Sequence, residues 1–584
     1  MGCDVRHGHP GRRPCRPRRR RGARGGRGPD GRGPDGRGPD RLPRQECRVT
    51  VHARVFRNCY RDSVELMQIA AELESLAGVA RAGLVMATPA NREVLAEAGL
   101  LADTALNAGP NDLVVAVATD DDAGAAAAFD RASVRLAGAV EGTATETVRT
   151  QARTIAEGVA KLGGADVALI STPGTYATAE ALKALKRGVN VFLFSDNVPV
   201  EDEVELKALA VERGLLLMGP DCGTAILDGV PLGFANAIRR GEIGLIGASG
   251  TGLQQVSCLI DRAGAGVSQA IGVGGRDLDA QVGGAMMLAA LRRLNADPGT
   301  RVIVLISKPP AAEVARRVLE TAGAMTTPVV VSFLGGDPAA AREHGLVPAW
   351  TFEAAATAAV ALSRGEPISD GMTDDKPAGR AGGDSAGVSG PTADAIARLR
   401  PGQWRIRGLF AGGSLSGEAK LVLRRTLGPE AAAAHEILDL GDDEYTVGRP
   451  HPMIDPRLRN ERIVDAADDP ATAIILLDVV LGYGSHPDPA GTLTPAIGDA
   501  QARAARAGRS VVVVASVCGT DADLQGLSAQ ESILAGAGVL LAPSNAGAAG
   551  LAAAIAAGAA ASSPGGGVGG SGGGSDAAAS VVAR

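Results

Sequence analysis

The segment GEIGLIGASGTGLQQVSCLI, residues 241–260, contains the clearest structural signal in the chain. Its apolar run at 243–246 predicts a buried strand, and a glycine turn at 247–252 ends that strand. A helix should follow at once, because apolar side chains then recur on one helical face: Leu253, Val256, Leu259 and Ile260. This order of elements predicts α/β architecture, with the turn at the carboxyl end of a strand.

The same turn predicts an anion-binding site. The first N–H groups of a helix have no intrahelical acceptor, and the helix dipole favours negative charge there. The turn lacks the lysine of GxxxxGK[ST] and the spacing of the dinucleotide-binding turn, so it indicates phosphate or carboxylate before nucleotide. The candidate ligands of the anion are Gly247, Ser249, Gly250, Thr251 and Gly252.

Short apolar runs alternate with helical windows on both sides of this segment, which predicts βαβ crossovers and parallel sheets. The expected fold class is α/β, with three doubly wound parallel-sheet domains at 49–240, 241–364 and 398–561. Residues 365–397 are polar and glycine-rich and are predicted to be a linker. The expected strands lie at 49–56, 82–86, 113–118, 166–170, 190–194, 214–218, 243–246, 268–273, 302–306, 328–333, 406–411, 436–440, 473–479, 510–515 and 538–541.

The two ends of the chain differ from this pattern. Residues 1–48 hold fifteen Arg against four Asp and one Glu, and residues 562–584 are rich in glycine; both are expected to be disordered tails. A basic tail could also bind RNA or phospholipid. Because the whole chain carries a net charge of −6, the folded part is acidic, which argues against a nucleic-acid surface.

Composition excludes further classes of protein. The seven cysteines are scattered, with no CxxC pair and no histidine at metal spacing, so neither a disulfide framework nor a metal site is expected. No apolar run reaches the roughly 18 residues that a membrane span needs, and the first 48 residues lack the apolar core of a signal peptide. The chain is therefore expected to be cytoplasmic, without a membrane or nucleic-acid partner.

Several motifs occur in a fixed order: TPAN at 88–91, FSDNV at 194–198, MGPDCGT at 218–224, GASGTG at 247–252, GVGGRDLD at 272–279, SKPP at 307–310, LDLGDDEYTVGRPHPMIDP at 438–456 and LLDVVLGYG at 476–484. Over residues 49–541 this combination closely resembles the FdrA family, a branch of the NDP-forming acyl-CoA synthetase superfamily typified by succinyl-CoA synthetase. The resemblance implies a Rossmann-like CoA-binding-type domain at 49–240 and two flavodoxin-like ligase domains at 241–364 and 398–561.

The resemblance also implies a second half for the anion site. In the related ligases two helix N-termini, one from each ligase domain, converge on the phosphoryl group. Here the second would follow the strand at 473–479, with Gly482, Gly484 and Ser485 as candidate ligands. Two helix dipoles and a set of amides could stabilise a dianion or a developing oxyanion without a metal.

Two departures from succinyl-CoA synthetase bear on function. The chain has no room for an ATP-grasp domain between its domains, and RNCYRDSVELM at 57–67 replaces the expected glycine-rich CoA loop. FdrA-type proteins are associated with oxamate carbamoyltransferase of ureide catabolism, which exchanges carbamoyl phosphate and oxamate with oxalurate. The resemblance therefore implies that the chain handles an acyl or carbamoyl phosphate, most simply in carbamoyl transfer.

Two alternatives stay open. One is a succinate–CoA ligase-like subunit that works with a separate ATP-grasp partner, and the other is a non-catalytic scaffold that binds CoA or an acyl phosphate. CoA is accordingly an open cofactor. The expected partners are a small phosphorylated substrate and either other subunits of the same pathway or further copies of the chain.

Three residues are candidates for catalysis, each with a structural alternative. Cys222 lies in a loop that resembles the GPNC segment of the family, as a nucleophile or a buried structural thiol. His344 lies near the place of the family's phosphohistidine, but AREHGLVPAW at 341–350 lacks its G-H-A-G setting. His451 could act as a general acid or base near neutral pH, or brace two domains as a buried polar group.

Three basic residues are candidates for binding a substrate carboxylate. Arg276 lies at the end of a strand and could clamp the carboxylate, or pair with Asp277 to brace the loop. Lys308 has the same two interpretations, and the two prolines after it fix the turn that would present it. Arg449 lies in a proline-stiffened loop of charged residues, which favours a substrate-binding role.

Overall fold

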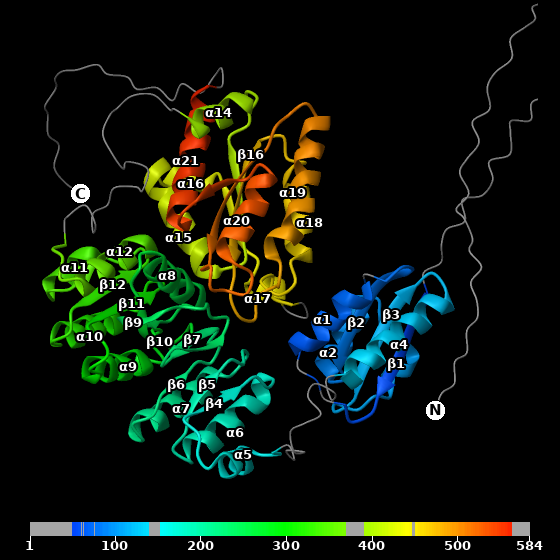
Figure 1. Cartoon of the computed structure of the whole chain (residues 1–584), viewed down its shortest axis with the longest axis horizontal. Coiled ribbons are helices and arrows are strands. Elements are labelled where there is room, and N and C mark those ends of the chain that lie inside the picture. Colours follow the sequence, from blue (N-terminus) through cyan, green and yellow to red (C-terminus); the bar gives the residue numbers. More distant parts are fainter. Residues whose placement is uncertain are drawn as a thin grey trace, which may run out of the picture.

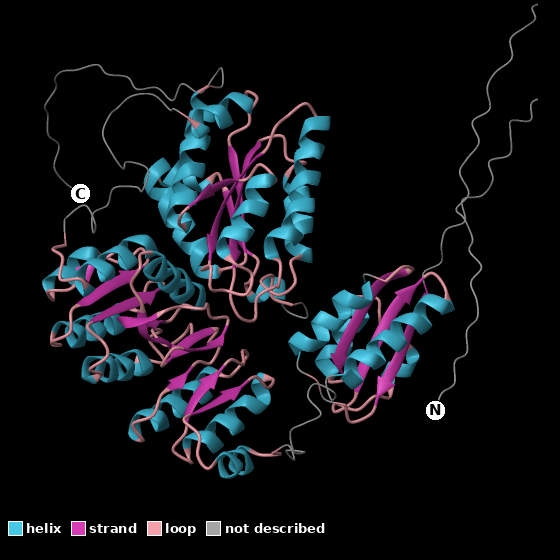
Figure 2. Cartoon of the chain, in the orientation of Figure 1, coloured by secondary structure: helices cyan, strands magenta, loops and turns pink. Residues whose placement is uncertain are grey.

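A computed structural model describes residues 50–138 except 60, 62 and 75, then residues 152–368, 390–446 and 450–562. The tail expected at 1–48 and all but the first residue of the tail expected at 562–584 lie outside the described residues, as does most of the expected linker. Four sheets organise the described chain, and helices cover their faces (Figures 1 and 2). The α/β class is confirmed, and three of the four sheets are built mainly of parallel strands.

The first sheet is antiparallel, because β3 lies between β1 and β2 and runs opposite to both. Alternate side chains of β3 enter two cores: Leu113 and Val115 pack with α1 and α4, and Val114 and Ala116 pack with α2 and α3. The elements are β1 (Thr50–Phe56), α1 (Ser63–Glu74), β2 (Val79–Met86), α2 (Pro89–Glu97), α3 (Asp103–Leu106), β3 (Leu113–Thr119) and α4 (Asp122–Gly138).

This arrangement corrects the expectation of one parallel sheet over 49–240. Alternating strands and helices occur both in parallel crossovers and where a third strand inserts between the first two, so periodicity alone does not separate these cases. The second part of the range does form a parallel sheet, of order β4-β5-β6. Its elements are α5 (Ile155–Leu162), β4 (Val167–Ile170), α6 (Gly174–Leu185), β5 (Asn190–Leu193), α7 (Val200–Glu212) and β6 (Leu217–Met218).

The third sheet is seven-stranded, in the order β13-β12-β11-β9-β10-β7-β8. The strands β9 to β13 are parallel and have the flavodoxin-like order 2-1-3-4-5, and the antiparallel hairpin β7–β8 extends the sheet beside β10. The elements are β7 (Thr224–Leu227), β8 (Val230–Gly233), β9 (Arg240–Gly247), α8 (Gly250–Arg262), β10 (Val267–Gly272), α9 (Ala285–Ala296), β11 (Val302–Ser307), α10 (Ala312–Gly323), β12 (Val329–Phe333), α11 (Pro338–Glu343), β13 (Val347–Pro348) and α12 (Phe352–Ser363).

The fourth sheet has the order β15-β14-β16-β17-β18, again 2-1-3-4-5 and all parallel. Helix α14 lies within the expected linker and packs on α21, where Ile396 contacts Gly558. The elements are α14 (Pro391–Arg398), β14 (Arg405–Phe410), α15 (Gly413–Leu427), α16 (Pro429–Ala433), β15 (Glu436–Asp439), α17 (Asp443–Thr446), α18 (Arg457–Ala466), β16 (Thr472–Val480), α19 (Pro489–Arg506), β17 (Val512–Cys518), α20 (Leu527–Gly536), β18 (Leu540–Ala542) and α21 (Asn545–Ala561).

The two flavodoxin-like units pack through equivalent helices. In each unit the first and last helices, α8 and α12 in one and α15 and α21 in the other, form the contact. One hydrophobic core runs through all four, with Val256, Phe352, Leu415 and Ala549 among its buried members. Because each helix begins at the carboxyl end of a strand, this packing brings the N-termini of α8 and α15 together.

Among the helices of the described residues, none combines the length and apolar character that crossing a membrane requires.

Candidate functional site

The N-terminus of α8 has the form that the sequence indicates. Strand β9 ends at Gly247, and Ser249 caps the helix by accepting the N–H of Gly252 at 3.0 Å. A Cβ on Gly247 would lie 2.7 Å from Leu253 Cγ, so a side chain there would force Leu253 to shift. The amides of Gly250 and Thr251 have no acceptor among the described residues, so the first turn keeps free donors.

The helix that faces α8 is α15, which the sequence analysis did not select. It begins at Gly413 directly after β14, in the same topological place as α8. The Oγ atoms of Ser249 and Ser414 lie 2.5 Å apart. A Cβ on Gly412 would lie 3.0 Å from Thr251 Cγ2, so the two helix N-termini touch. The signal was present in AGGSLSG at 411–417, which repeats the strand, glycine and serine order of GASGTG.

The loop at 482–485 joins the two units instead of forming the second anion site. Tyr483 donates its N–H to Ala235 O at 2.8 Å, and a Cβ on Gly482 would lie 2.5 Å from the same oxygen. The N–H of Gly482 is taken by Gln525 Oε1 at 3.2 Å. Gly482 and Gly484 are therefore explained by the close approach of residues 234–235, whereas the buried hydroxyl of Ser485 has no partner among the described residues. The next helix, α19, starts further along the chain.

Beside α15 lies a buried ion pair. The carboxylate of Asp478, on β16, accepts the N–H groups of Ala411 and Gly412, each at 2.8 Å. Arg459 donates to Asp478 Oδ1 at 2.9 Å and to Leu409 O at 3.0 Å, and burial lowers the pKa of its guanidinium. The pair fixes the turn before α15 while leaving the first amides of the helix, those of Gly413, Ser414 and Leu415, without an acceptor among the described residues.

Asp439 and Lys308 approach the same place from the two units. Asp439 ends β15 and accepts the N–H of Gly441 at 3.0 Å through Oδ1. Burial raises the pKa of Asp439, and the positive charge of Lys308 opposes that shift. Lys308 follows β11 at the carboxyl edge of its sheet and is exposed. Lys308 therefore stays a candidate for the site, and Asp439 is an additional candidate that the sequence analysis missed.

His451 packs between the units. Its ring lies 5.9 Å from that of Phe234, and its Nδ1 accepts the N–H of Met453 at 3.2 Å. Burial lowers the pKa of His451 to about 4, so the imidazole is neutral near pH 7 and holds its proton on Nε2. This environment favours the brace over the general acid or base.

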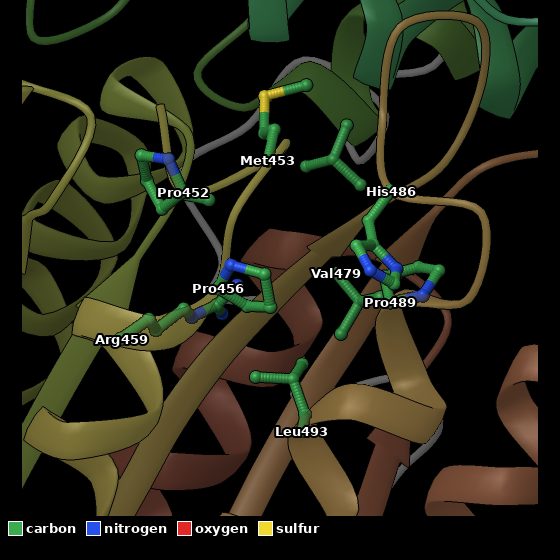
Figure 3. A pocket seen from close by; sticks show the side chains of 10 residues that line it. Pro452, Met453, Pro456, Arg459, Val479, His486, Pro489 and Leu493 are labelled. Carbon is green, nitrogen blue, oxygen red and sulfur yellow. The ribbon is translucent and has the colours of Figure 1, made fainter. Parts of the chain in front are cut away.

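A small cavity lies between the loop at 450–456 and the start of α19 (Figure 3). His486 and Pro489 line one side, and Pro456 and Arg459 line the other. Its volume of about 10 Å³ leaves room for roughly one water molecule, so it is too small for a substrate.

Of the other two catalytic candidates, Cys222 directly precedes Gly223, whose Cα would lie 3.7 Å from a Cβ on Gly250 at the start of α8, whereas His344 lies away from the paired helix N-termini. Cys222 is buried and its pKa is raised to about 12 by burial, so it stays a thiol, which argues for the structural alternative. His344 follows α11 and precedes β13, which places it at the amino edge of the sheet, opposite to the start of α8. That position argues against a phosphorelay through His344.

Two arginine candidates remain, Arg276 and Arg449, and the structure describes only Arg276. Arg276 donates to Val198 O at 2.8 Å and forms an ion pair with Glu203 at 3.0 Å, beside a buried pair of Lys207 and Asp277 at 2.8 Å. Arg276 thus braces the loop, but its ion-pair partner is Glu203 and not the expected Asp277, which pairs with Lys207 instead. Arg449 lies outside the described residues.

Comparison with protein families divides the chain in agreement with its sheets. The family described as CoA-ligase matches residues 409–555, the CoA binding domain matches 239–335, and the "AllF, heavy metal-associated domain" matches 49–152. The CoA-binding match thus falls on the unit that starts at β9, where the sequence resemblance indicated a ligase domain. Among the described residues no group of three or more His, Cys, Asp and Glu side chains is placed so that it could hold a metal ion.

Comparison with known proteins gives both a close and a partial relative. An Escherichia coli (strain K12) protein, "Uncharacterized protein YahF", is 43% identical over 508 residues, which cover 84% of this chain and 95% of that protein. The α-2 subunit of a mitochondrial ADP-forming succinate–CoA ligase from Trichomonas vaginalis is 31% identical over 155 residues, or 26% of this chain and 49% of that subunit.

One similar solved structure is an ATP citrate lyase from Methanothrix soehngenii in complex with citrate and coenzyme A. It is 16% identical in sequence, and the match covers 42% of this chain and 45% of that chain. The TM-score is 0.33, so the overall shapes differ. The identity to YahF over most of both chains, together with the CoA-ligase and CoA binding domain matches, shows the family. The chain belongs to the FdrA family of YahF-like proteins, within the succinyl-CoA synthetase-like superfamily of acyl-CoA ligases.

Proposed function

We propose that the paired N-termini of α8 and α15 hold the phosphoryl group of a small acyl or carbamoyl phosphate, and that the chain transfers the acyl or carbamoyl group to an acceptor. The observation that supports this most strongly is the contact of Ser249 and Ser414, whose Oγ atoms lie 2.5 Å apart at two helix starts. Free amides from both first turns surround that contact, and Lys308 adds a positive charge near it.

This geometry suits a leaving phosphate. Two helix dipoles and fixed N–H donors stabilise negative charge without reorganising during the reaction, and they act most strongly where water is largely excluded. Ser249 and Ser414 are both mostly buried, so the contact is shielded from solvent. The site can therefore stabilise the charge that develops on phosphate as its bond to the carbonyl carbon breaks.

Carbamoyl transfer is the proposed reaction. The amide nitrogen of oxamate attacks the carbonyl carbon of carbamoyl phosphate, a C–N bond forms, the C–O bond to phosphate breaks, and the proton lost by nitrogen leaves with the phosphate. The products are oxalurate and hydrogen phosphate. This reaction draws on the energy of the acyl phosphate itself and requires no nucleotide.

A second candidate is thioester synthesis together with a separate nucleotide-binding subunit. It is favoured by the CoA-binding match at 239–335 and by the succinate–CoA ligase α subunit among the relatives. Lys308 and the free amides of α8 fit a phosphate of CoA as well as they fit a phosphoryl donor. This candidate needs a phosphate carrier other than His344, which lies at the opposite edge of the sheet.

The test is a turnover assay on the full chain with radiolabelled carbamoyl phosphate and oxamate. The proposal expects labelled oxalurate, with a kcat at least tenfold lower in the Ser249→Ala, Ser414→Ala double variant and unchanged in Thr321→Ala, which removes a hydroxyl from the exposed face of α10. Formation of a CoA thioester from ATP once an ATP-grasp subunit is added, with no oxalurate in either condition, would establish the second candidate instead.

A further inference from the structure

Asp439 presents an acceptor to the anion site. Its Oδ1 is engaged by the N–H of Gly441 at 3.0 Å, whereas Oδ2 has no donor among the described residues. A Cβ built on Gly413, the first residue of α15, would lie 2.4 Å from Oδ2. The second carboxylate oxygen of Asp439 therefore lies against the first turn of α15, next to the free amides that would hold an anion.

The charges around Asp439 come from both units. Lys308, at the end of β11, favours the ionised form, while Asp478 on β16 and Asp442 after β15 oppose it. Burial is the largest influence, and together these effects raise the pKa of Asp439 above its usual value. Arg459 is paired with Asp478 and offsets that neighbour's charge. The carboxyl group thus takes up a proton more readily than an exposed aspartate.

We propose that Asp439 makes the anion site selective for ligands that bring a hydrogen-bond donor to it. The inference rests on the anion site proposed above. An ionised carboxylate only accepts hydrogen bonds, so an oxyanion held beside it needs a proton between the two oxygens. Hydrogen phosphate carries such a proton, whereas sulfate does not and meets Asp439 as a bare like charge.

The same requirement separates two classes of phosphorylated substrate. A carbamoyl phosphate carries N–H groups that can donate to Asp439 Oδ2, whereas an acetyl phosphate carries only a methyl group at that position. Sulfate or acetyl phosphate could be accommodated only if Asp439 itself takes up the proton, which becomes harder as the pH rises. The specificity of the site for carbamoyl over acyl groups would then reside in this one oxygen.

The experiment is equilibrium dialysis of radiolabelled inorganic phosphate against the full chain at pH 7, with sulfate as competitor. The wild type should bind phosphate at least tenfold more tightly than sulfate. In Asp439→Asn the amide oxygen still accepts from Gly441, but an NH₂ group replaces Oδ2, so sulfate should compete as well as phosphate does. Asp442→Asn removes a neighbouring exposed carboxylate and should keep the selectivity.

Equal binding of the two anions by the wild type, or unchanged selectivity in Asp439→Asn, would overturn the inference while leaving the anion site in place. Absence of any phosphate binding would overturn both. A second comparison requires no variant: carbamoyl phosphate should displace labelled phosphate from the wild type at concentrations at least tenfold lower than acetyl phosphate does, and equal displacement would contradict the role of Asp439.

Discussion

The two flavodoxin-like units share one topology but prepare their first helices differently. In the first unit Ser249 caps α8 with its side chain. In the second unit the N-cap of α15 is Gly412, which has no side chain to do this, and the buried pair of Asp478 and Arg459 holds the preceding turn. The same helix start is thus fixed by a local hydroxyl in one unit and by long-range charge in the other.

Helices α8 and α15 also differ in charge further along, in their second turn. Counted from the N-cap, Glu418 on α15 occupies the position of Gln255 on α8, and both are buried. Glu418 accepts the N–H of Phe352, at the start of α12 in the other unit, at 2.6 Å, and the side-chain amide of Asn545 at 2.8 Å. The repeated fold therefore keeps its backbone while the charges along its first helix diverge, and α15 is the helix of the two that carries a buried ionisable side chain at this position.

Removing the charge from the second unit should have the largest effect on stability. Arg459→Met leaves Asp478 buried without its counter-ion, which typically costs about 3–5 kcal/mol. The matched variant in the first unit is Arg239→Met, because Arg239 is half exposed and pairs with Asp261 at 2.8 Å; its loss should cost at most about 1 kcal/mol. Chemical denaturation of the two variants would measure the difference, and similar losses would contradict the contrast between the units.

The second largest effect should be a dependence of the unfolding free energy on pH. Burial raises the pKa of Glu418 to about 7 from an ordinary 4.5, so the native state binds a proton that the unfolded chain has lost. This contribution is fully present below about pH 4.5 and disappears as the pH rises through 7, by up to about 3 kcal/mol.

Glu418→Gln, which makes α15 resemble α8, should flatten the fall in unfolding free energy between pH 5 and 7.5. The control is Glu320→Gln on an exposed helix face, which should leave the slope unchanged. An unaltered slope in Glu418→Gln would place the pH sensitivity elsewhere.

Adding a methyl group to the first residue of each helix should have a smaller effect. Gly413→Ala brings a Cβ within 2.4 Å of Asp439 Oδ2, and such overpacking costs about 1–3 kcal/mol. Gly250→Ala meets nothing closer than Thr224 Oγ1 at 3.3 Å and should be tolerated within about 1 kcal/mol. Melting temperatures of the two variants check this, and equal values would mean that Asp439 does not lie against α15.

The smallest expected effect concerns the two hydroxyls. Each variant loses the buried hydrogen bond between the two Oγ atoms, and Ser249→Ala also removes a helix cap, so it should cost about 1 kcal/mol more than Ser414→Ala. Denaturation midpoints of the two single variants would rank them. The reverse order would show that Ser414 holds α15 in a way that the hydrogen bonds do not reveal.

The local periodicity of the sequence predicted most strands and helices, but it did not predict which strands pair in each sheet. The strands expected at 243–246 and 302–306 form as β9 and β11, and the turn after β9 starts a capped helix as expected. The antiparallel pairing of β1 and β3 was missed because the order of strands in a sheet depends on contacts between distant segments. A glycine can likewise mark either a ligand site or a close backbone contact. Gly482 was interpreted as an anion ligand, but in the structure its lack of a side chain lets the backbone of Ala235 approach.

Of the candidate site, the sequence predicted the part that α8 contributes but not the part that comes from the second flavodoxin-like unit. GASGTG follows its strand directly, so its chemistry could be predicted from adjacent residues. The facing residues Ser414 and Asp439 come from 165 and more residues away, and only the packing of α8 on α15 brings them near. The same reason explains Cys222, whose sequence neighbours suggest reactivity while its burial raises its pKa to about 12.

Calorimetric titration of the full chain with inorganic phosphate tests the central claim most directly, with two variants that add the same charge. Gly250→Asp places a carboxylate at the first residue of α8, where it repels an anion, and Gly498→Asp places one on an exposed face of α19 with open space around it. The account predicts one phosphate bound per chain, at least tenfold more weakly by Gly250→Asp and with unchanged affinity by Gly498→Asp. Equal affinity in all three proteins, or no binding by the wild type, would contradict it.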